Sequence, residues 1–221
     1  MNLYIFLKKL INQAENGDNS KKSKEKIMEL KNSKTLQNLA NAFAGECQAN
    51  ARYVFISDKA KAEGYHEVGC ALDAISKNEL YHAKVFYNAI ASCGVTPNVP
   101  VNGGYPFKEG GDLIADLGYA ADNEYQESTS IYPGYADEAD KEGFADIANR
   151  FRLAAKVEDC HMKLLNDLRK QLTDGSLYSR PSPVKWKCEN CGHETTANEA
   201  PAVCPLCGSK QGYVKLILSD N

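Results

Sequence analysis

Two ionisable residues interrupt an apolar pattern in the last long amphipathic stretch of the chain. From residue 144 onwards, positions at alternating steps of three and four form one stripe: Phe144, Ile147, Phe151, Ala154, Glu158, His161, Leu165 and Leu168. A helix with this spacing turns all of these side chains toward one seam. An ionised carboxylate in a protein core is very costly unless it is paired or bound to a metal. Glu158 therefore needs a partner with positive charge.

Three earlier stretches carry glutamate on an apolar stripe in the same way. Their stripes are Leu36, Leu39, Phe43, Glu46, Asn50 and Tyr53; then Val68, Leu72, Ile75, Glu79, His82, Phe86, Ala89 and Cys93; then Leu113, Leu117, Ala120, Glu124, Glu127 and Ile131. The second stripe repeats the Glu-x-x-His motif, and the third offers Glu-x-x-Glu. Residues three apart on a helix share one face, so each pair projects into the same seam.

The four stripes supply seven candidate metal ligands: Glu46, Glu79, His82, Glu124, Glu127, Glu158 and His161. Five carboxylates in one core repel one another, and two divalent or trivalent cations would relieve that repulsion. Carboxylate oxygen with some imidazole suits iron or manganese better than zinc or copper. Di-iron bundles carry a Glu on each of two helices and Glu-x-x-His on the other two. A single Glu-x-x-His is typical of a solvated face, but the full set predicts a dinuclear site.

The stripes predict a four-helix bundle with one long connection. Ser33 and Thr35 can cap the first helix, which we expect to end near Gly64. The Gly- and Pro-rich connection 97–111 is longer than most links between bundle helices, as a crossover requires. We expect the third helix to end or kink near Pro133, with residues 134–143 joining it to the fourth helix.

A different metal motif lies near the C-terminus. Two Cys-x-x-Cys pairs, each followed by Gly, are separated by twelve residues: Cys188, Cys191, Cys204 and Cys207. Four thiolates form a tetrahedral site that holds either structural zinc or one iron, and the spacing does not decide between them. Trp186 and Tyr213 flank the pairs and give this small module its sizeable apolar mass. We expect the metal to supply much of its folding energy.

Length and motif positions predict four segments in the 221 residues. They are an extension (1–27), a helical bundle (28–172), a linker (173–184) and the four-cysteine module (185–221). The net charge of −3 argues against nucleic acid as a partner. No apolar run approaches the roughly 18 residues of a membrane helix, and residues 1–27 show no convincing signal or transit peptide.

The remaining four cysteines are scattered singly: Cys47, Cys70, Cys93 and Cys160. This distribution favours metal ligation plus buried free thiols over a disulfide framework, and so a reducing, cytoplasmic location. Cys47 and Cys160 directly adjoin the candidate ligands Glu46 and His161. We expect both to be small buried apolar side chains, with oxidation by peroxide as the alternative.

In its motifs and their order the chain closely resembles rubrerythrin across residues 28–217. The resemblance rests on Phe43-Ala-Gly-Glu46-Cys-Gln-Ala-Asn-Ala-Arg52-Tyr53, both Glu-x-x-His helices, Glu124-x-x-Glu127 followed by Tyr132-Pro133, and the terminal Lys185-Trp186-Lys187-Cys188 module. It implies a ferritin-like di-iron bundle joined to a rubredoxin-like domain with one iron on four cysteines. It also implies reduction of hydrogen peroxide to water, with electrons ultimately from NAD(P)H through a reductase or a rubredoxin.

The resemblance also implies individual roles for the candidate ligands. Glu46 and Glu124 would be terminal carboxylates, Glu79 and Glu158 would bridge the two irons, and His161 would ligate one iron. Glu127 and His82 would exchange as ligands of the other iron with its redox state. Tyr53 and Tyr132 match tyrosines near the irons. For each, a catalytic role and a core aromatic whose hydroxyl finds a partner are equally good interpretations.

Family members pair head to tail, so the resemblance implies a homodimer in which one subunit's four-cysteine iron serves the other subunit's bundle. Two rival functions remain open. A ferroxidase or iron-handling protein needs the same ligands without an electron-donor module. A non-enzymatic sensor would carry zinc on the four cysteines as a purely structural ion.

Overall fold

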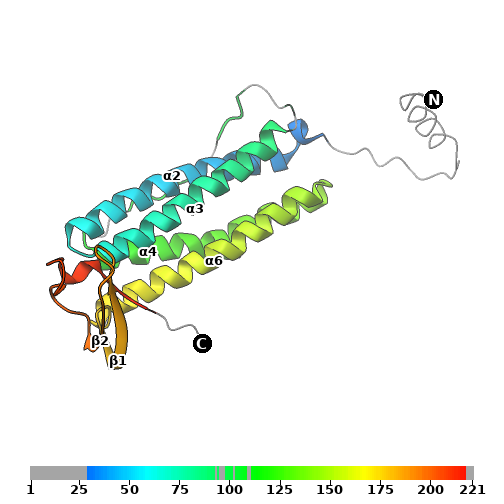
Figure 1. The fold of residues 1–221 in the computed structure, drawn as a ribbon. Helices are drawn as coiled ribbons and strands as arrows, with labels where there is room; N and C mark the ends of the chain where they lie inside the picture. Colours follow the sequence, from blue (N-terminus) through cyan, green and yellow to red (C-terminus); the bar gives the residue numbers. More distant parts are fainter. Residues whose placement is uncertain (1–28, 93, 95–97, 102, 109–110, 218–221) are drawn as a thin grey trace, which may run out of the picture.

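The computed structural model describes residues 29–92, 94, 98–101, 103–108 and 111–217. The predicted extension 1–27 and Cys93 lie outside the described residues. Helices run side by side to form the bundle, and a small β module sits at one end of it (Figure 1). This arrangement confirms the predicted ferritin-like four-helix bundle followed by a four-cysteine module.

The first half of the bundle is a hairpin of two long helices. A short 3₁₀ turn, η1 (Leu30–Asn32), precedes α2 (Lys34–Ala62), and α3 (His66–Ala91) runs back along α2 (Figure 1). As predicted, the Ser33 hydroxyl caps α2 by accepting a hydrogen bond from the Leu36 backbone N–H. The helix ends at Ala62, and Gly64 follows with a φ of +92° that glycine adopts at little cost.

The third stripe gives a longer helical path than the sequence predicts. Helix α4 (Leu113–Gln126) continues through a π-helical turn, η2 (Glu127–Ile131), into α5 (Tyr132–Lys141). The expected end near Pro133 and the expected connection over 134–143 are therefore wrong. Pro133 directly follows the π-helical turn, and its missing backbone N–H does not end the helical path there. Helix α6 (Ala145–Thr173) then packs along α4 and α5.

Two apolar clusters hold the bundle together, one on each side of the buried glutamates. One is rich in aromatic rings, with Phe86, Tyr132 and Phe151 stacked or tilted at centroid distances of 5.1–5.9 Å. The other is aliphatic and includes Leu72, Leu117 and Leu165, which are fully buried. None of the described helices is long and apolar enough to cross a membrane.

The C-terminal module is a three-stranded antiparallel sheet in the order β2–β1–β3. The strands are β1 (Ser179–Cys188), β2 (Glu194–Glu199) and β3 (Val214–Leu216), and a 3₁₀ turn η3 (Gln211–Tyr213) precedes β3. Trp186 is buried in the small core, and its indole N–H donates to the Ala197 carbonyl at 3.0 Å. Tyr213 lies outside that core, against the bundle, so only Trp186 has the packing role expected of both.

The stretch 179–184, which the sequence suggests as part of a linker, belongs to strand β1. Its pairing with β2 is irregular between Ser179 and Val184, where Pro181 and Pro183 stand. Proline lacks the N–H that regular pairing needs and is tolerated at such irregularities. The ordered strand thus starts earlier than composition indicates, and the domain boundaries themselves stay a prediction.

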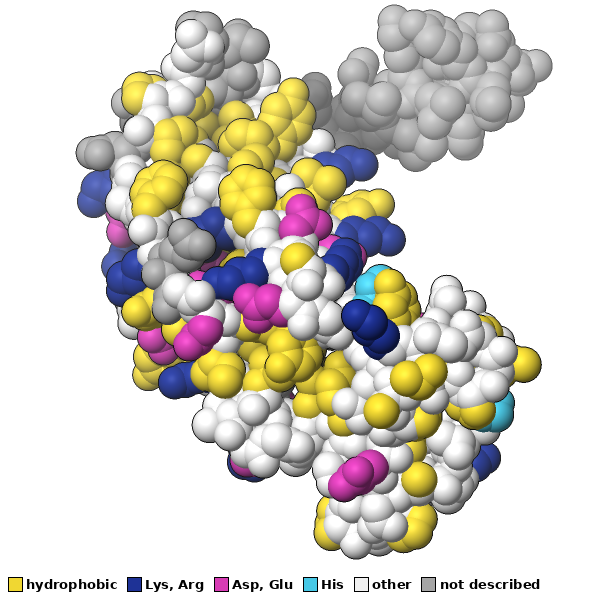
Figure 2. All heavy atoms as spheres, turned by 90° about the vertical axis from the view of Figure 1, so that its left-hand side faces the viewer, with side chains coloured by type: hydrophobic (Ala, Val, Ile, Leu, Met, Phe, Trp, Pro, Cys, Tyr) yellow, Lys and Arg dark blue, Asp and Glu magenta, His cyan; other side chains and the backbone are white. Residues whose placement is uncertain are grey.

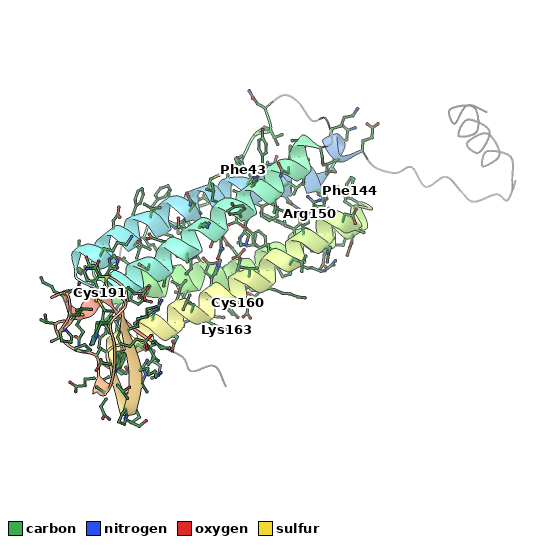
Figure 3. The ribbon with its side chains drawn as sticks, in the orientation of Figure 1. Phe43, Phe144, Arg150, Cys160, Lys163 and Cys191 are labelled. Atoms are coloured by element: carbon green, nitrogen blue, oxygen red, sulfur yellow. The ribbon has the colours of Figure 1, made fainter. Side chains whose placement is uncertain are left out.

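The module rests on the turn between α2 and α3. The His66 and Tyr213 rings stack at a centroid distance of 4.1 Å. A Cβ at Gly212 would lie 1.7 Å from the Gly64 carbonyl oxygen, so only glycine permits this approach. Figure 3 shows Cys191 in the module at this end of the bundle and Phe144, which precedes α6, toward the other end.

The single cysteines differ from the prediction, because Cys47, Cys70 and Cys160 are all exposed. Consecutive helical residues are turned by about 100°. A residue directly after Glu46 or before His161 therefore points away from the seam that these ligands face. On the face of the molecule in Figure 2, hydrophobic, basic and acidic side chains are interspersed.

Glu142 ties the start of α2 to the α5–α6 turn, and its removal should destabilise the bundle. Its carboxylate accepts the backbone N–H groups of Lys34 and Thr35 at 2.9 and 2.8 Å, and the Thr35 hydroxyl at 2.6 Å. We expect Glu142→Ala to lower the free energy of unfolding by about 1–2 kcal/mol. Urea unfolding measures this, with the exposed Asp137→Ala as control; equal effects of the two variants would contradict the assignment.

The same contact predicts a pH dependence. Partial burial tends to raise the pKa of Glu142, but the hydrogen bonds from Thr35 and Lys34 outweigh it and lower the pKa. A lowered pKa means that the stabilisation is present above the ordinary glutamate pKa and is lost as the pH falls through the folded value. The stability difference between wild type and Glu142→Ala should therefore shrink below about pH 4.

Candidate metal centre

The buried glutamates and histidines of four helices meet at the middle of the bundle. Glu79 and Glu158 lie at its centre, and each presents its two oxygens to different histidines. His82 Nδ1 lies 3.0 Å from one Glu79 oxygen and 3.1 Å from one Glu158 oxygen. His161 Nδ1 lies 3.0 Å from the other oxygen of each. This geometry makes two adjacent ligand sets that share two carboxylates.

Each ligand set is completed by one further glutamate. Glu46 lies 3.8 Å from His82 Nδ1, and Glu124 lies 3.9 Å from His161 Nδ1. The two sets are Glu46, Glu79, His82 and Glu158, and Glu79, Glu124, Glu158 and His161, each with its ligand atoms within 4.8 Å of one another. The structure thus brings together six of the seven predicted ligands. It gives Glu79 and Glu158 the shared position that bridging requires.

Glu127 is the one predicted ligand outside both sets. It is the first residue of the π-helical turn and is partly exposed, whereas the other four glutamates are fully buried. Burial and the charges of Glu46, Glu158 and Glu79 raise its pKa. Glu127 lines the same cavity as Tyr132, the hydroxyl of which donates to Glu46, so it lies on the Glu46 side of the centre. Its role as a ligand stays a prediction.

Two buried tyrosines hold the outer glutamates in a crossed pattern. The Tyr53 hydroxyl on α2 donates to Glu124 on α4, and the Tyr132 hydroxyl on α5 donates to Glu46 on α2. Tyr53 follows Glu46 by seven residues, but Tyr132 follows Glu124 by eight. The π-helical turn absorbs the extra residue and lets the two tyrosines occupy equivalent places. Both hydroxyls have a defined partner, which the sequence left undecided.

The buried polar atoms fit two bound cations. Among the described residues, eight buried side-chain nitrogen and oxygen atoms have no hydrogen-bond partner, and six of them belong to Glu46, Glu79, Glu124, Glu158 and His161. Leaving such groups unsatisfied is costly. All six atoms lie in the two ligand sets, where a metal ion would satisfy them together. Carboxylate and imidazole donors of this kind suit iron.

The pKa shifts of the buried glutamates and histidines also indicate that positive charge is favoured in the cluster. Burial raises the pKa of Glu46 and Glu124 well above the usual range. Glu79 is buried too, but its contacts with the rings of His161 and His82 outweigh burial and lower its pKa to about 2. Burial alone would lower the pKa of His161, whereas its contacts with Glu158 and Glu79 raise it to about 10. The carboxylates thus draw positive charge to both positions, and a metal would replace these protons.

One outer contact that the sequence did not indicate orients His161. Its Nε2 lies 3.3 Å from the side-chain oxygen of Asn78, an exposed residue of α3. An acceptor at this distance favours the tautomer with the proton on Nε2. The Nδ1 lone pair is then free to face Glu79 and Glu158. The residue directly before Glu79 lies off the apolar stripe, so periodicity could not reveal it.

The four cysteines of the module also converge. The Sγ atoms of Cys188 and Cys207 are 3.7 Å apart, and those of Cys191 and Cys204 are 3.6 Å apart. A tetrahedron with metal–sulfur bonds of about 2.3 Å has edges of about 3.8 Å, so the cluster fits one tetrahedral ion. Hydrogen bonds from the Ser209 hydroxyl and N–H lower the pKa of Cys207 to about 6, which favours the ligating thiolate.

Comparison with known proteins agrees with both sites. A family model described as rubrerythrin matches residues 37–169, and one described as the rubrerythrin rubredoxin-like domain matches residues 186–214. The chain belongs to the rubrerythrin family. It is 38% identical to rubrerythrin of Clostridium perfringens over 85% of this chain and 96% of that protein. It is 40% identical to rubrerythrin-1 of Clostridium acetobutylicum over 87% of this chain and 98% of that protein.

Solved structures confirm the fold. The match to a nigerythrin in a mixed-valence state covers 92% of this chain and 95% of the nigerythrin chain, with a TM-score of 0.56 at 23% identity. The match to a bacterioferritin of Desulfovibrio desulfuricans covers 67% of this chain and 85% of the bacterioferritin chain, with a TM-score of 0.60 at 20% identity. Family and geometry together identify a di-iron site in the ferritin-like bundle and a four-cysteine site of rubredoxin type.

Removing a glutamate shared by both ligand sets should lower the iron content more than removing a glutamate of one set. We expect Glu79→Ala to remove both irons of the bundle, because Glu79 contributes to both ligand sets, whereas Glu124→Ala should spare the Glu46 side. Iron analysis measures this, with the four-cysteine iron as internal reference and the exposed Asp122→Ala on α4 as control. Equal iron loss in the two ligand variants would contradict the shared position of Glu79.

Proposed function

We propose that this protein is a di-iron peroxidase that reduces hydrogen peroxide to water with electrons passed through the four-cysteine iron. Membership of the rubrerythrin family supports an oxidoreductase that acts in oxidative stress. The observation that carries the finer proposal is the pair of ligand sets with shared Glu79 and Glu158, in a chain that also holds a one-electron centre. We place this activity in the cytoplasm, because the scattered single cysteines favour a reducing compartment.

Stoichiometry supports a dinuclear site. One peroxide, two electrons and two protons give two waters, with the O–O bond broken. When bound, two ferrous ions supply both electrons and polarise the peroxide as Lewis acids. Around them, the Tyr53 and Tyr132 hydroxyls hold Glu124 and Glu46 in place, and Asn78 fixes the tautomer of His161.

We assign as iron ligands the seven residues predicted from the sequence, with Glu127 and His82 as alternatives on the Glu46 side. His82 lies within that ligand set, 3.1 Å from Glu158, while Glu127 lies beside it on the π-helical turn. A carboxylate carries a negative charge that neutral imidazole lacks. Exchange of the two would match the charge of the ligands to the oxidation state of the iron.

The position of the module favours electron transfer between two subunits. The module contacts α3 at His66, sixteen residues before His82. At 1.5 Å per helical residue this corresponds to about 24 Å along the bundle. A head-to-tail homodimer would instead bring a second copy's module to the centre. A groove of about 380 Å³ between α3 and α6 exposes Val85 and Leu153 beside His82, and the module exposes Val203 and Leu206.

A mixed dimer tests the electron route. One subunit carries Cys188→Ser, which removes the one-electron centre, and the other carries Glu158→Ala, which disrupts the di-iron site. We expect this heterodimer to keep peroxidase activity with an NAD(P)H-dependent reductase or a rubredoxin as donor. Each variant homodimer should be inactive and serves as a control. An inactive heterodimer would exclude transfer between subunits.

The rivals are a ferroxidase, which needs the same ligands without an electron-donor module, and a sensor with structural zinc. Iron on four cysteines colours the purified protein red and bleaches on reduction, whereas zinc gives no such absorption. We expect the reduced protein to re-oxidise rapidly with hydrogen peroxide and slowly with oxygen. Faster reaction with oxygen would favour the ferroxidase, and a colourless module would favour the sensor.

A further inference from the structure

Two adjoining cavities lie on the α2 side of the bundle, away from the α3–α6 groove. The inner cavity, of about 290 Å³, lies beneath residues 103–106 and reaches Glu127 and Tyr132. The outer cavity, of about 470 Å³, lies between α2 and residues 106–108. Gln48, Arg52 and Pro106 line both, so the two meet at these residues. The inner cavity is called the Glu127 chamber below.

Arg52 brings an unused hydrogen-bond donor to the junction of these cavities. Its Nη1 is buried and has no hydrogen-bond partner among the described residues. A guanidinium stays charged in proteins and donates without accepting. A buried N–H of a charged group without an acceptor is costly. The conflict is resolved if a small ligand with an accepting oxygen occupies the chamber.

The chamber adjoins the di-iron centre on the Glu46 side. Glu127 and Tyr132 both line it, and the Tyr132 hydroxyl donates to Glu46. Arg52 lines the same chamber as Glu127. A ligand held between Arg52 and Glu127 would therefore stand next to one of the two metal positions.

The roof of the chamber is the segment around Tyr105, which is fixed to α2. The Tyr105 hydroxyl donates to the Asn41 carbonyl at 3.2 Å, and a Cβ at Gly45 would lie 3.7 Å from the Tyr105 ring. Amide side chains of Gln48, Asn123 and Gln126 contribute polar walls. A polar chamber with an aromatic roof suits a small hydrogen-bonding molecule.

We propose that the Glu127 chamber is the binding site through which hydroperoxides reach the di-iron centre, and that Arg52 donates a hydrogen bond from Nη1 to the peroxide oxygen. This inference rests on the proposed peroxidase function and deepens it by naming the substrate's route and a binding residue. Arg52 holds the substrate and transfers no proton. Tyr105 limits the size of the organic group that a hydroperoxide can carry past the roof.

Anion binding tests Arg52 independently of peroxidase activity. Azide added to the oxidised protein changes the visible absorption of the di-iron centre, and its dissociation constant can be titrated. We expect Arg52→Met to raise that constant about tenfold or more, as loss of a charge-assisted hydrogen bond implies. Arg52→Lys should have a smaller effect because it keeps the charge. Arg150→Met, which removes an arginine of α6 in the opposite groove (Figure 3), should leave the constant unchanged.

Single-turnover oxidation then tests the substrate. Reduced protein is mixed with hydrogen peroxide, and the second-order rate constant should fall about tenfold in Arg52→Met at unchanged iron content. Tyr105→Ala should raise the rate with cumene hydroperoxide roughly tenfold relative to hydrogen peroxide. Unchanged azide binding in Arg52→Met, or an unchanged preference in Tyr105→Ala, would overturn the proposal. Arg52-dependent azide binding without peroxidase activity would retain the chamber and refute the proposed function.

Discussion

The burial of four glutamate carboxylates in one helical bundle, with Glu127 beside them, is the constraint on which the rest of this structure depends. Water would stabilise those charges, and the bundle interior does not. The protein distributes the cost over four helices, so that each glutamate faces a neighbour able to share a proton or a metal. The two histidines contact the two shared glutamates, which defines two positions where positive charge is stabilised. Fold and cofactor are therefore coupled, because the buried glutamates and histidines gather in the two ligand sets.

A near-symmetry of the two helical pairs organises the site. Glu46 and Glu79–His82 on the first hairpin correspond to Glu124 and Glu158–His161 on the second. The crossed bonds from Tyr53 and Tyr132 join the two halves. Glu127 breaks the symmetry, since the equivalent place on α2, three residues after Glu46, is Ala49. The π-helical turn, the Glu127 chamber and Arg52 all lie on that asymmetric side, which gives the two metal positions different surroundings.

The ligands could be predicted from the sequence because helical periodicity fixes which residues share a seam. Glu79, His82, Glu158 and His161 stand on that period and meet as expected. The π-helical turn could not be predicted from the stripes, because one inserted residue leaves the apolar pattern before and after it intact. The difference between the Glu46–Tyr53 and Glu124–Tyr132 spacings was its signal. Arg52 and Asn78 stand off the stripes, and their roles arise from contacts between helices that one sequence does not encode locally.

The buried carboxylates and histidines should hold two adjacent irons, distinct from the iron on four cysteines. Mössbauer spectroscopy of the oxidised protein loaded with iron-57 distinguishes these irons. We expect two populations in a ratio of two to one. The larger should be a spin-coupled ferric pair with oxygen and nitrogen ligands, and the smaller an isolated ferric ion with sulfur ligands. Isolated iron without coupling in the bundle, or iron confined to the sulfur site, would contradict this expectation.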